Sequence, residues 1–133
     1  MFEASTKGKG DCEAFPDVCR TESGTMEAHT NRAFLRQADG ETCSEKVRIR
    51  NKKACTQKTE IRHSEGNKET VKGGIFSGEA CGQVIFREGS SKVSVEGERI
   101  AHTGCATSHN GSNSNVPTGM QTGASQQKVF VEA

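Results

Sequence analysis

Residues 92–101 of this 133-residue chain read K-V-S-V-E-G-E-R-I-A, and the pattern of this stretch recurs elsewhere in the sequence. A strand of alternating apolar and polar residues runs into a tight turn and then into a second short strand. Residues 46–54, K-V-R-I-R-N-K-K-A, follow the same pattern, and residues 128–133, K-V-F-V-E-A, repeat its first half. Period-two alternation predicts three apolar pairs that each share one face of a strand: Val47 with Ile49, Val93 with Val95, and Val129 with Val131.

Three similar β lobes in one chain predict a body with pseudo-threefold symmetry. Such a body suits a trimeric partner, because one chain can then contact three identical subunits. Long polar stretches at residues 56–73 and 103–121 separate the lobes, and we expect them to be loops. The one stretch in which the sequence favours a helix is residues 31–38.

The composition favours an all-β chain with short strands and long loops, folded as one domain over residues 1–133. Fourteen residues are Val or Ile and one is Leu, and 15 Gly and 12 Thr suit many turns. Leu, Ile, Val and Phe together supply only 21 residues, which is little for a self-sufficient core. We therefore expect a further stabilising device.

The net charge is +1, and Lys and Arg are interleaved with Asp and Glu along the sequence. This balance argues against a nucleic-acid-binding protein and predicts an ordinary solvated surface. The first ten residues lack the apolar segment of a signal peptide, and no apolar run is long enough to span a membrane. We therefore expect a protein made in the cytoplasm without a signal peptide.

Six cysteines, at positions 12, 19, 43, 55, 81 and 105, are many for so short a chain. Without an export signal, metal ligation or buried thiols are favoured over disulfides. His63 and His109 each follow the turn of their repeat by the same twelve positions, counted from Asn51 and Gly97. Because equivalent positions meet near a pseudo-threefold axis, we expect the two imidazoles to bind one structural zinc ion.

Cysteine thiolates are expected to complete the zinc site. Cys19, in a predicted loop of the first lobe, is the expected third ligand. Cys105 lies four residues before His109 and is the candidate for the fourth position, for which Cys81 and His29 compete. The remaining cysteines, at positions 12, 43 and 55, are expected to be structural thiols.

Several stretches match motifs of a known family. Residues 89–101 look like a repeat in which a Gly-Ser turn leads a strand into a Gly-Lys-Pro-Ala-Ala-Arg-like segment, although Pro-Ala-Ala-Arg itself is absent here. Residues 16–21 match a P-D-V-C-K-T stretch, residues 73–78 a G-G-V-x-S-G stretch, and residues 109–110 a late His-Asn pair. The chain thus resembles the PAAR proteins, and most closely the PAAR-like branch found with type VI secretion, whose early Pro-rich stretch it lacks.

The resemblance implies a cone-shaped β fold with zinc near the apex and a flat base on the β-helix of a trimeric spike. It gives Cys19, His63 and His109 a ligand role. The implied function is a structural tip that caps and sharpens the spike of a contractile injection system, one tip per trimer. Such a tip is made in the bacterial cytoplasm, is secreted on the spike and touches the target membrane transiently. Effector proteins are possible further partners.

Two other functions stay open. A small secreted binding domain stapled by disulfides is one alternative, and a count of free thiols separates it from the spike tip. An enzyme is disfavoured, because the chain has no nucleophile elbow, no Walker-type loop and no His-Glu-x-x-His motif. A zinc-dependent hydrolase would need water as the fourth ligand, with a base such as Glu65 near His63.

Overall fold

The computed structural model describes residues 1–66 and 71–133, and these residues form an all-β fold. Two single-turn 3-10 helices, η1 (Leu35–Gln37) and η2 (Gly40–Thr42), interrupt the strands. The strands are β1 (Phe2–Glu3), β2 (Asp11–Thr21), β3 (Met26–Phe34), β4 (Arg48–Ile49), β5 (Lys52–Lys53), β6 (Glu60–Ile61), β7 (Val71–Gly74), β8 (Val84–Phe86), β9 (Ser94–Val95), β10 (Glu98–Arg99), β11 (Ala106–His109), β12 (Val116–Gln121) and β13 (Phe130–Val131). Across the described ranges, no helix is long and apolar enough to cross a membrane.

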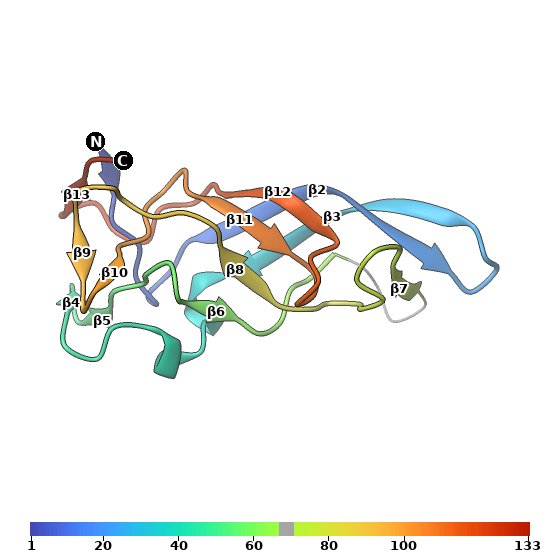
Figure 1. The fold of residues 1–133 in the computed structure, drawn as a ribbon, viewed down its shortest axis with the longest axis horizontal. Helices are drawn as coiled ribbons and strands as arrows, with labels where there is room; N and C mark the ends of the chain where they lie inside the picture. Colours follow the sequence, from blue (N-terminus) through green and yellow to red (C-terminus); the bar gives the residue numbers. More distant parts are fainter. Residues whose placement is uncertain (67–70) are drawn as a thin grey trace.

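Three two-stranded antiparallel sheets lie together at one end of the elongated molecule (Figure 1). They are β4 with β5, β9 with β10, and β13 with β1. The first two are hairpins whose turn residues have positive φ, Arg50 and Asn51 in one and Glu96 and Gly97 in the other. Two consecutive positive φ values are typical of the tight turns that match strand twist. In the third lobe the two strands come from opposite ends of the chain, so the repeat at residues 128–133 finds its second half at residues 2–4.

A closed ring of backbone hydrogen bonds joins the three lobes. The amide of Ser5 donates to the carbonyl of Ala101, that of Ala101 to Cys55, and that of Cys55 back to Ser5, each at 2.9 Å. All three residues are fully buried. The flanking residues form three β-bridges in the same cyclic order: Ala4 with His102, Thr6 with Ala54, and Thr56 with Ile100. The ring confirms the pseudo-threefold arrangement of the lobes that the repeats predict.

Equivalent apolar side chains from each lobe fill the space beside this ring. Ile49, Val95 and Val131, the second apolar residue of each repeat, are at most 8 % exposed and belong to one cluster. Its other buried members are Ala4, Ala54 and Ile100, and Val47 and Val93 pack against it from partly buried positions. We call this end of the molecule, made of the three lobes, the base.

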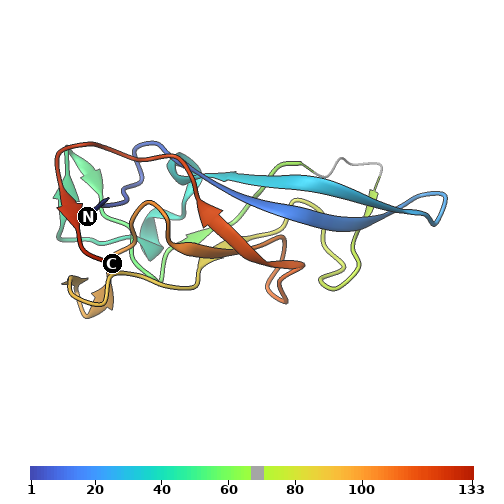
Figure 2. The same ribbon diagram turned by 90° about the horizontal axis from the view of Figure 1, so that it is seen from above.

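A seven-stranded antiparallel sheet forms the rest of the molecule. Its strand order is β3-β2-β12-β11-β8-β6, with β7 paired to β2. Two isolated bridges, Arg32 with Glu65 and Ala38 with Ile61, link the β3 side to the β6 side, so the sheet curls back on itself. The β2–β3 hairpin continues away from the base to the opposite end (Figures 1 and 2).

Three expectations about local structure were wrong. Residues 31–38 form the end of β3 and the turn η1 rather than a helix, because β3 pairs with β2 along most of its length. Residues 103–121 contain the paired strands β11 and β12 rather than a free loop. The expected loop at 56–73 contains β6 and the start of β7, and its residues 67–70 lie outside the described part of the chain.

Candidate functional site

The base repeats the same hydrogen bonds in each lobe. The amides of Ala4, Ala54 and Ile100 donate to the carbonyls of Val129, Val47 and Val93, at 3.0, 3.0 and 3.1 Å. The same three valines donate their own amides to a side-chain oxygen three residues earlier. These acceptors are Ser44 and Ser90 through Oγ, at 3.0 and 3.1 Å, and Gln126 through Oε1 at 2.8 Å. Three nearly equivalent surfaces therefore face outward around one axis.

The outer strand of each lobe has one bonded neighbour and one open edge. The inner strands β5, β10 and β1 accept further bonds from the next lobe, since Lys53, Arg99 and Glu3 receive the amides of Lys7, Gln57 and Thr103 at 2.9 Å. Among the described residues, β4, β9 and β13 pair only with the inner strand of their own lobe. Figure 1 draws β4 and β9 nearer the end of the molecule than β5 and β10. The end of the base thus presents strand edges that can accept further pairing.

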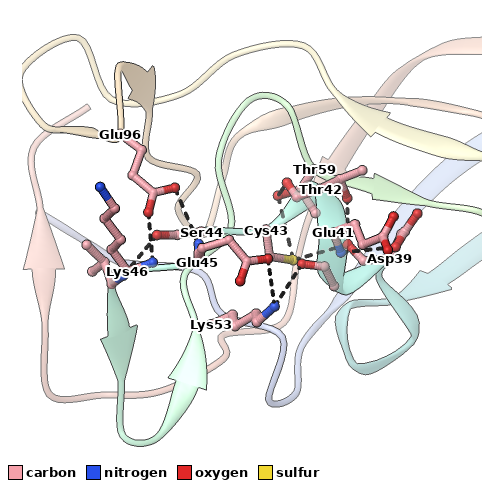
Figure 3. Close-up of polar contacts among 12 residues, drawn as sticks. Asp39, Glu41, Thr42, Cys43, Ser44, Glu45, Lys46, Lys53, Thr59 and Glu96 are labelled. Carbon is pink, nitrogen blue, oxygen red and sulfur yellow. Dashed lines mark hydrogen bonds and ion pairs between the residues drawn. The ribbon is translucent and has the colours of Figure 1, made fainter.

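A carboxylate fixes the spacing between two of the lobes (Figure 3). Glu96, in the turn of the β9–β10 hairpin, accepts the amide of Lys46 at 2.7 Å and that of Glu45 at 3.3 Å. Desolvation opposes the charged form of Glu96, but these backbone hydrogen bonds prevail and lower its pKa. The lobes are therefore tied by side chains as well as by the backbone ring.

The four residues expected to bind zinc do not converge. His63 follows β6 and is exposed, whereas Cys19 lies inside β2, not in a loop, and is fully buried. The equal spacing of the two histidines has a structural counterpart, because β6 and β11 flank β8. His109, however, is the last residue of β11 and is fully buried. Cys105 is also buried and accepts the amide of His102 at 3.4 Å.

The donor atoms themselves do not fit a zinc site. The Nδ1 atom of His109 lies 2.7 Å from Asn31 Oδ1, and its Nε2 atom lies 2.7 Å from Thr107 Oγ1. The amide nitrogen of Asn31 already donates elsewhere, so Oδ1 accepts from Nδ1–H and Nε2 accepts the hydroxyl hydrogen of Thr107. Neither imidazole nitrogen has a lone pair left for a metal. Residues 1–66 and 71–133 contain no group of three or more His, Cys, Asp or Glu that could hold a metal ion.

A buried carboxylate is linked to His109 through Asn31. Asp17 in β2 is fully buried, and its Oδ1 atom receives the side-chain amides of Asn115 at 2.6 Å and Asn110 at 3.1 Å. Its Oδ2 atom lies 3.3 Å from the amide nitrogen of Asn31. Burying a charge is costly unless hydrogen bonds compensate it, and this cluster supplies them. We call Asp17, Asn31, His109, Asn110 and Asn115 the polar network.

The polar network joins three of the motifs that mark the family resemblance. Asp17 belongs to the P-D-V-C stretch, and Asn110 to the His-Asn pair. The G-G-I-F-S-G loop contributes through its backbone, because the amide of Phe76 donates to Asn115 Oδ1 at 2.8 Å. Gly74 must lack a side chain, since a Cβ atom there would lie 2.2 Å from Asn115 Cγ. Motifs far apart in the sequence therefore build one site.

Burial also sets the protonation of His109. Desolvation lowers its pKa from 6.5 to about 4, and the negative charge of Asp17 only partly opposes this shift. The imidazole is therefore neutral at neutral pH and acts as a hydrogen-bonding strut. Sequence reasoning selected His109 but missed Asp17, Asn31 and Asn115. The position of Asp17 inside a family motif is the signal in the sequence that could have identified it.

Comparison with known proteins identifies a family for this chain. The model of one family, the Toxin PAAR-like domain, matches residues 10–117 of the chain. That range contains the whole polar network and two of the three lobes, and it leaves out β1 and β13. No curated protein and no solved structure matches the chain.

Proposed function

The chain belongs to the Toxin PAAR-like domain family, and from this premise we propose that it is the structural tip of a contractile injection spike. In this role it caps a trimeric spike protein, one tip per trimer. The observation that carries the proposal is the cyclic base, in which three lobes repeat the same hydrogen bonds about one axis. A threefold-symmetric receptor offers three identical surfaces, which one chain of this design matches.

Docking follows from the open strand edges. The outer strands β4, β9 and β13 can each pair with a strand of one spike subunit, as exposed edges do in β-augmentation. Beside them, Val129 is 40 % and Phe130 is 44 % exposed, which adds apolar contact area. Backbone pairing and apolar contacts depend little on salt, so we expect the complex to persist at moderate ionic strength.

The proposed role is mechanical rather than catalytic, and rigidity is what it requires. The polar network supplies rigidity away from the base, because every member is held by partners from distant parts of the chain. This proposal needs no zinc ion, and metal analysis of the purified protein tests the zinc binding that the sequence predicts. The six cysteines carry no disulfide, which does not favour the alternative of a disulfide-stapled binding domain.

A pair of matched variants tests the docking surface. Val129→Glu places a charge at the base, and Phe15→Glu places the same charge at an exposed apolar site on β2, where Phe15 is 62 % exposed. We expect Val129→Glu to weaken binding to the immobilised spike trimer of the same injection system about tenfold or more, whereas Phe15→Glu leaves it unchanged. Equal affinities for the two variants, both folded by circular dichroism, would overturn the assignment of the base.

A further inference from the structure

The three lobes have similar backbone structures but different charges. Residues 46–54 contain five Lys or Arg and no acidic residue. The equivalent residues 92–101 contain two of each sign, and residues 128–133 contain one of each sign. The distribution of charge therefore breaks the pseudo-threefold symmetry of the base, at the lobe formed by β4 and β5.

This lobe borders two adjoining hollows, of about 690 and 440 Å³, that share Gly8 and Lys52. We call them together the basic groove. None of the residues that line it is acidic. The cations that line it are Lys7, Lys9, Arg36, Arg48, Arg50, Lys52, Lys53 and Lys128.

Most of these cations have no acidic partner in the part of the chain that the structure describes. Lys53 is the exception, since its Nζ atom lies 3.1 Å from Glu45 Oε1. Lys7 donates to the backbone carbonyl of Arg36 at 2.8 Å, and nearby Asp39 is engaged by Arg62 at 2.6 Å. The interleaved charges of the sequence thus predicted a mixed surface, whereas the fold gathers uncompensated cations on one side.

We propose that the basic groove binds an extended acidic segment of another polypeptide. Its two connected hollows favour an elongated ligand, and arginine forks such as that of Arg50 bind carboxylates in two-point contacts. Amide side chains, including Gln127 and Asn51, add neutral hydrogen-bonding groups to the lining. The groove contains no aromatic residue, so it lacks the stacking platform that single-stranded nucleic acid uses and the anchors that a membrane surface uses.

The isolated protein suffices for the test, so the outcome does not depend on spike docking. Fluorescence anisotropy measures binding of a labelled oligo-glutamate peptide at low salt, with a labelled oligo-glutamine peptide as the uncharged probe. Removing two cations of the groove, Arg50→Ala with Lys52→Ala, should weaken binding about tenfold or more. The matched control, Lys58→Ala with Lys92→Ala, removes two cations outside the groove and should leave binding unchanged.

Three results would overturn this proposal. The first is equal affinity of the two double variants for oligo-glutamate. The second is binding of oligo-glutamine as tight as that of oligo-glutamate. The third is tighter binding of single-stranded DNA or of phosphatidylglycerol vesicles than of the acidic peptide. Circular dichroism of each variant confirms that the fold is retained.

The lobe formed by β4 and β5 also contains two thiols, Cys43 and Cys55 (Figure 3 labels Cys43). The amide of Ser44 donates to the carbonyl of Ala54 at 2.9 Å, which places Cys43 opposite Cys55. Both cysteines belong to one buried cluster, in which each influences the pKa of the other. The equivalent pairs in the other lobes are Gly89 with Ala101 and Ser125 with Ser5, so this lobe alone of the three carries a thiol at both positions.

Cys43 is the less deeply buried member of the pair, 6 % exposed. It lines a hollow of about 180 Å³, whereas Cys55 is fully buried behind it. The hydrogen bond from Cys55 lowers the pKa of Cys43 to about 7, and the same contact together with burial raises the pKa of Cys55. A low-pKa thiol at the wall of a hollow, beside a second thiol, is typical of dithiols that form disulfides.

We infer that Cys43 and Cys55 form a disulfide when the protein meets an oxidising disulfide such as oxidised glutathione. The Cys43 thiolate attacks one glutathione sulfur and releases one glutathione thiolate. Cys55 then loses its proton and attacks the Cys43 sulfur, which forms the Cys43–Cys55 bond and releases the second glutathione. The protein loses two hydrogens, and the oxidised glutathione is reduced to two thiols.

Thiol counting in denaturant, followed by peptide mapping, tests this pair. Oxidised glutathione should remove two free thiols from the wild-type protein and join the peptides that contain Cys43 and Cys55. Cys81→Ser, a change at the partly exposed cysteine, should leave this reaction intact, whereas Cys55→Ala should abolish the internal bond. A bond between any other cysteines, or the loss of no thiols from folded protein, would overturn the inference.

Discussion

Replacing His109 with Gln should remove much of the acid sensitivity of this fold. In the folded protein, burial holds the pKa of His109 at about 4, against 6.5 for an ordinary histidine. Between these two pH values the unfolded chain binds a proton at this site and the folded chain does not. Stability is therefore complete above pH 6.5 and falls as the pH drops towards 4.

The size of the effect follows from the same two values. Each pH unit in this window lowers the free energy of unfolding by about 1.4 kcal/mol, for a total of about 3 kcal/mol. Asp39 and Glu96, whose pKa values are lowered from 3.8 and 4.5, lose their contribution mainly below the window. The acid sensitivity between pH 6.5 and 4.5 can thus be assigned to His109.

Urea unfolding followed by circular dichroism between pH 7.5 and 4.5 measures this effect, since the chain has no Trp or Tyr for fluorescence. The wild-type protein should lose stability across this range, and His109→Gln should be less stable at pH 7.5 but depend far less on pH. His63→Gln, a matched change at an exposed histidine, should behave as the wild type does. An unchanged pH dependence in His109→Gln would refute the assignment of a buried neutral imidazole.

Two buried positions and the metal content give further predictions. Gly119→Ala should cost about 2 kcal/mol, because the new Cβ atom would lie 2.5 Å from the His109 ring, whereas Gly40→Ala, with 3.7 Å of space, should cost far less in the same unfolding assay. Asp17→Asn should cost about 2 kcal/mol or more, because an NH2 group would replace the oxygen that accepts from Asn31 and Asn110, against roughly 0.5 kcal/mol or less for exposed Glu27→Gln. Elemental analysis should find well under one zinc per folded chain, and one full equivalent would contradict the hydrogen-bonded role of His109.

The parts of the fold that depend on local sequence were predictable. In residues 46–54 and 92–101, the alternation of apolar and polar residues and the turn residues all lie within ten positions. The sequence of each copy therefore predicts its hairpin, β4–β5 or β9–β10. The third lobe was predictable only in part, because Phe2 pairs with Val131 across nearly the whole chain. No local pattern marks residues 2–3 as the missing strand.

The curled sheet was harder to predict because its strands bury polar side chains. Thr107 and His109 in β11 and Gln121 in β12 are fully buried, so these strands carry no apolar alternation and look like loops in the sequence. The sequence could not test the hypothesis of a zinc site, for a related reason. Equal spacing placed β6 and β11 beside the same strand, but it could not show that neighbouring amides and hydroxyls already occupy the nitrogens of His109.

The polar network was visible in the sequence only through family motifs. Asp17 and Asn110 stood inside matched stretches, but nothing in their spacing indicated that the two side chains meet at 3.1 Å. Asn31 lay in a segment expected to be helical, where its side chain would have had no defined partner. Contacts between residues so far apart in the sequence are set by the topology of the sheet, which a single sequence does not reveal.

The mass of the complex between this chain and its spike shows whether one tip caps one trimer. Light scattering of the purified spike trimer, mixed with an excess of the 14.3 kDa chain and separated by size exclusion, gives the number of tips bound. The cyclic base predicts one tip per trimer, at low and at moderate salt alike. Three tips per trimer, or no complex while both proteins are folded, would contradict the role proposed for the three lobes.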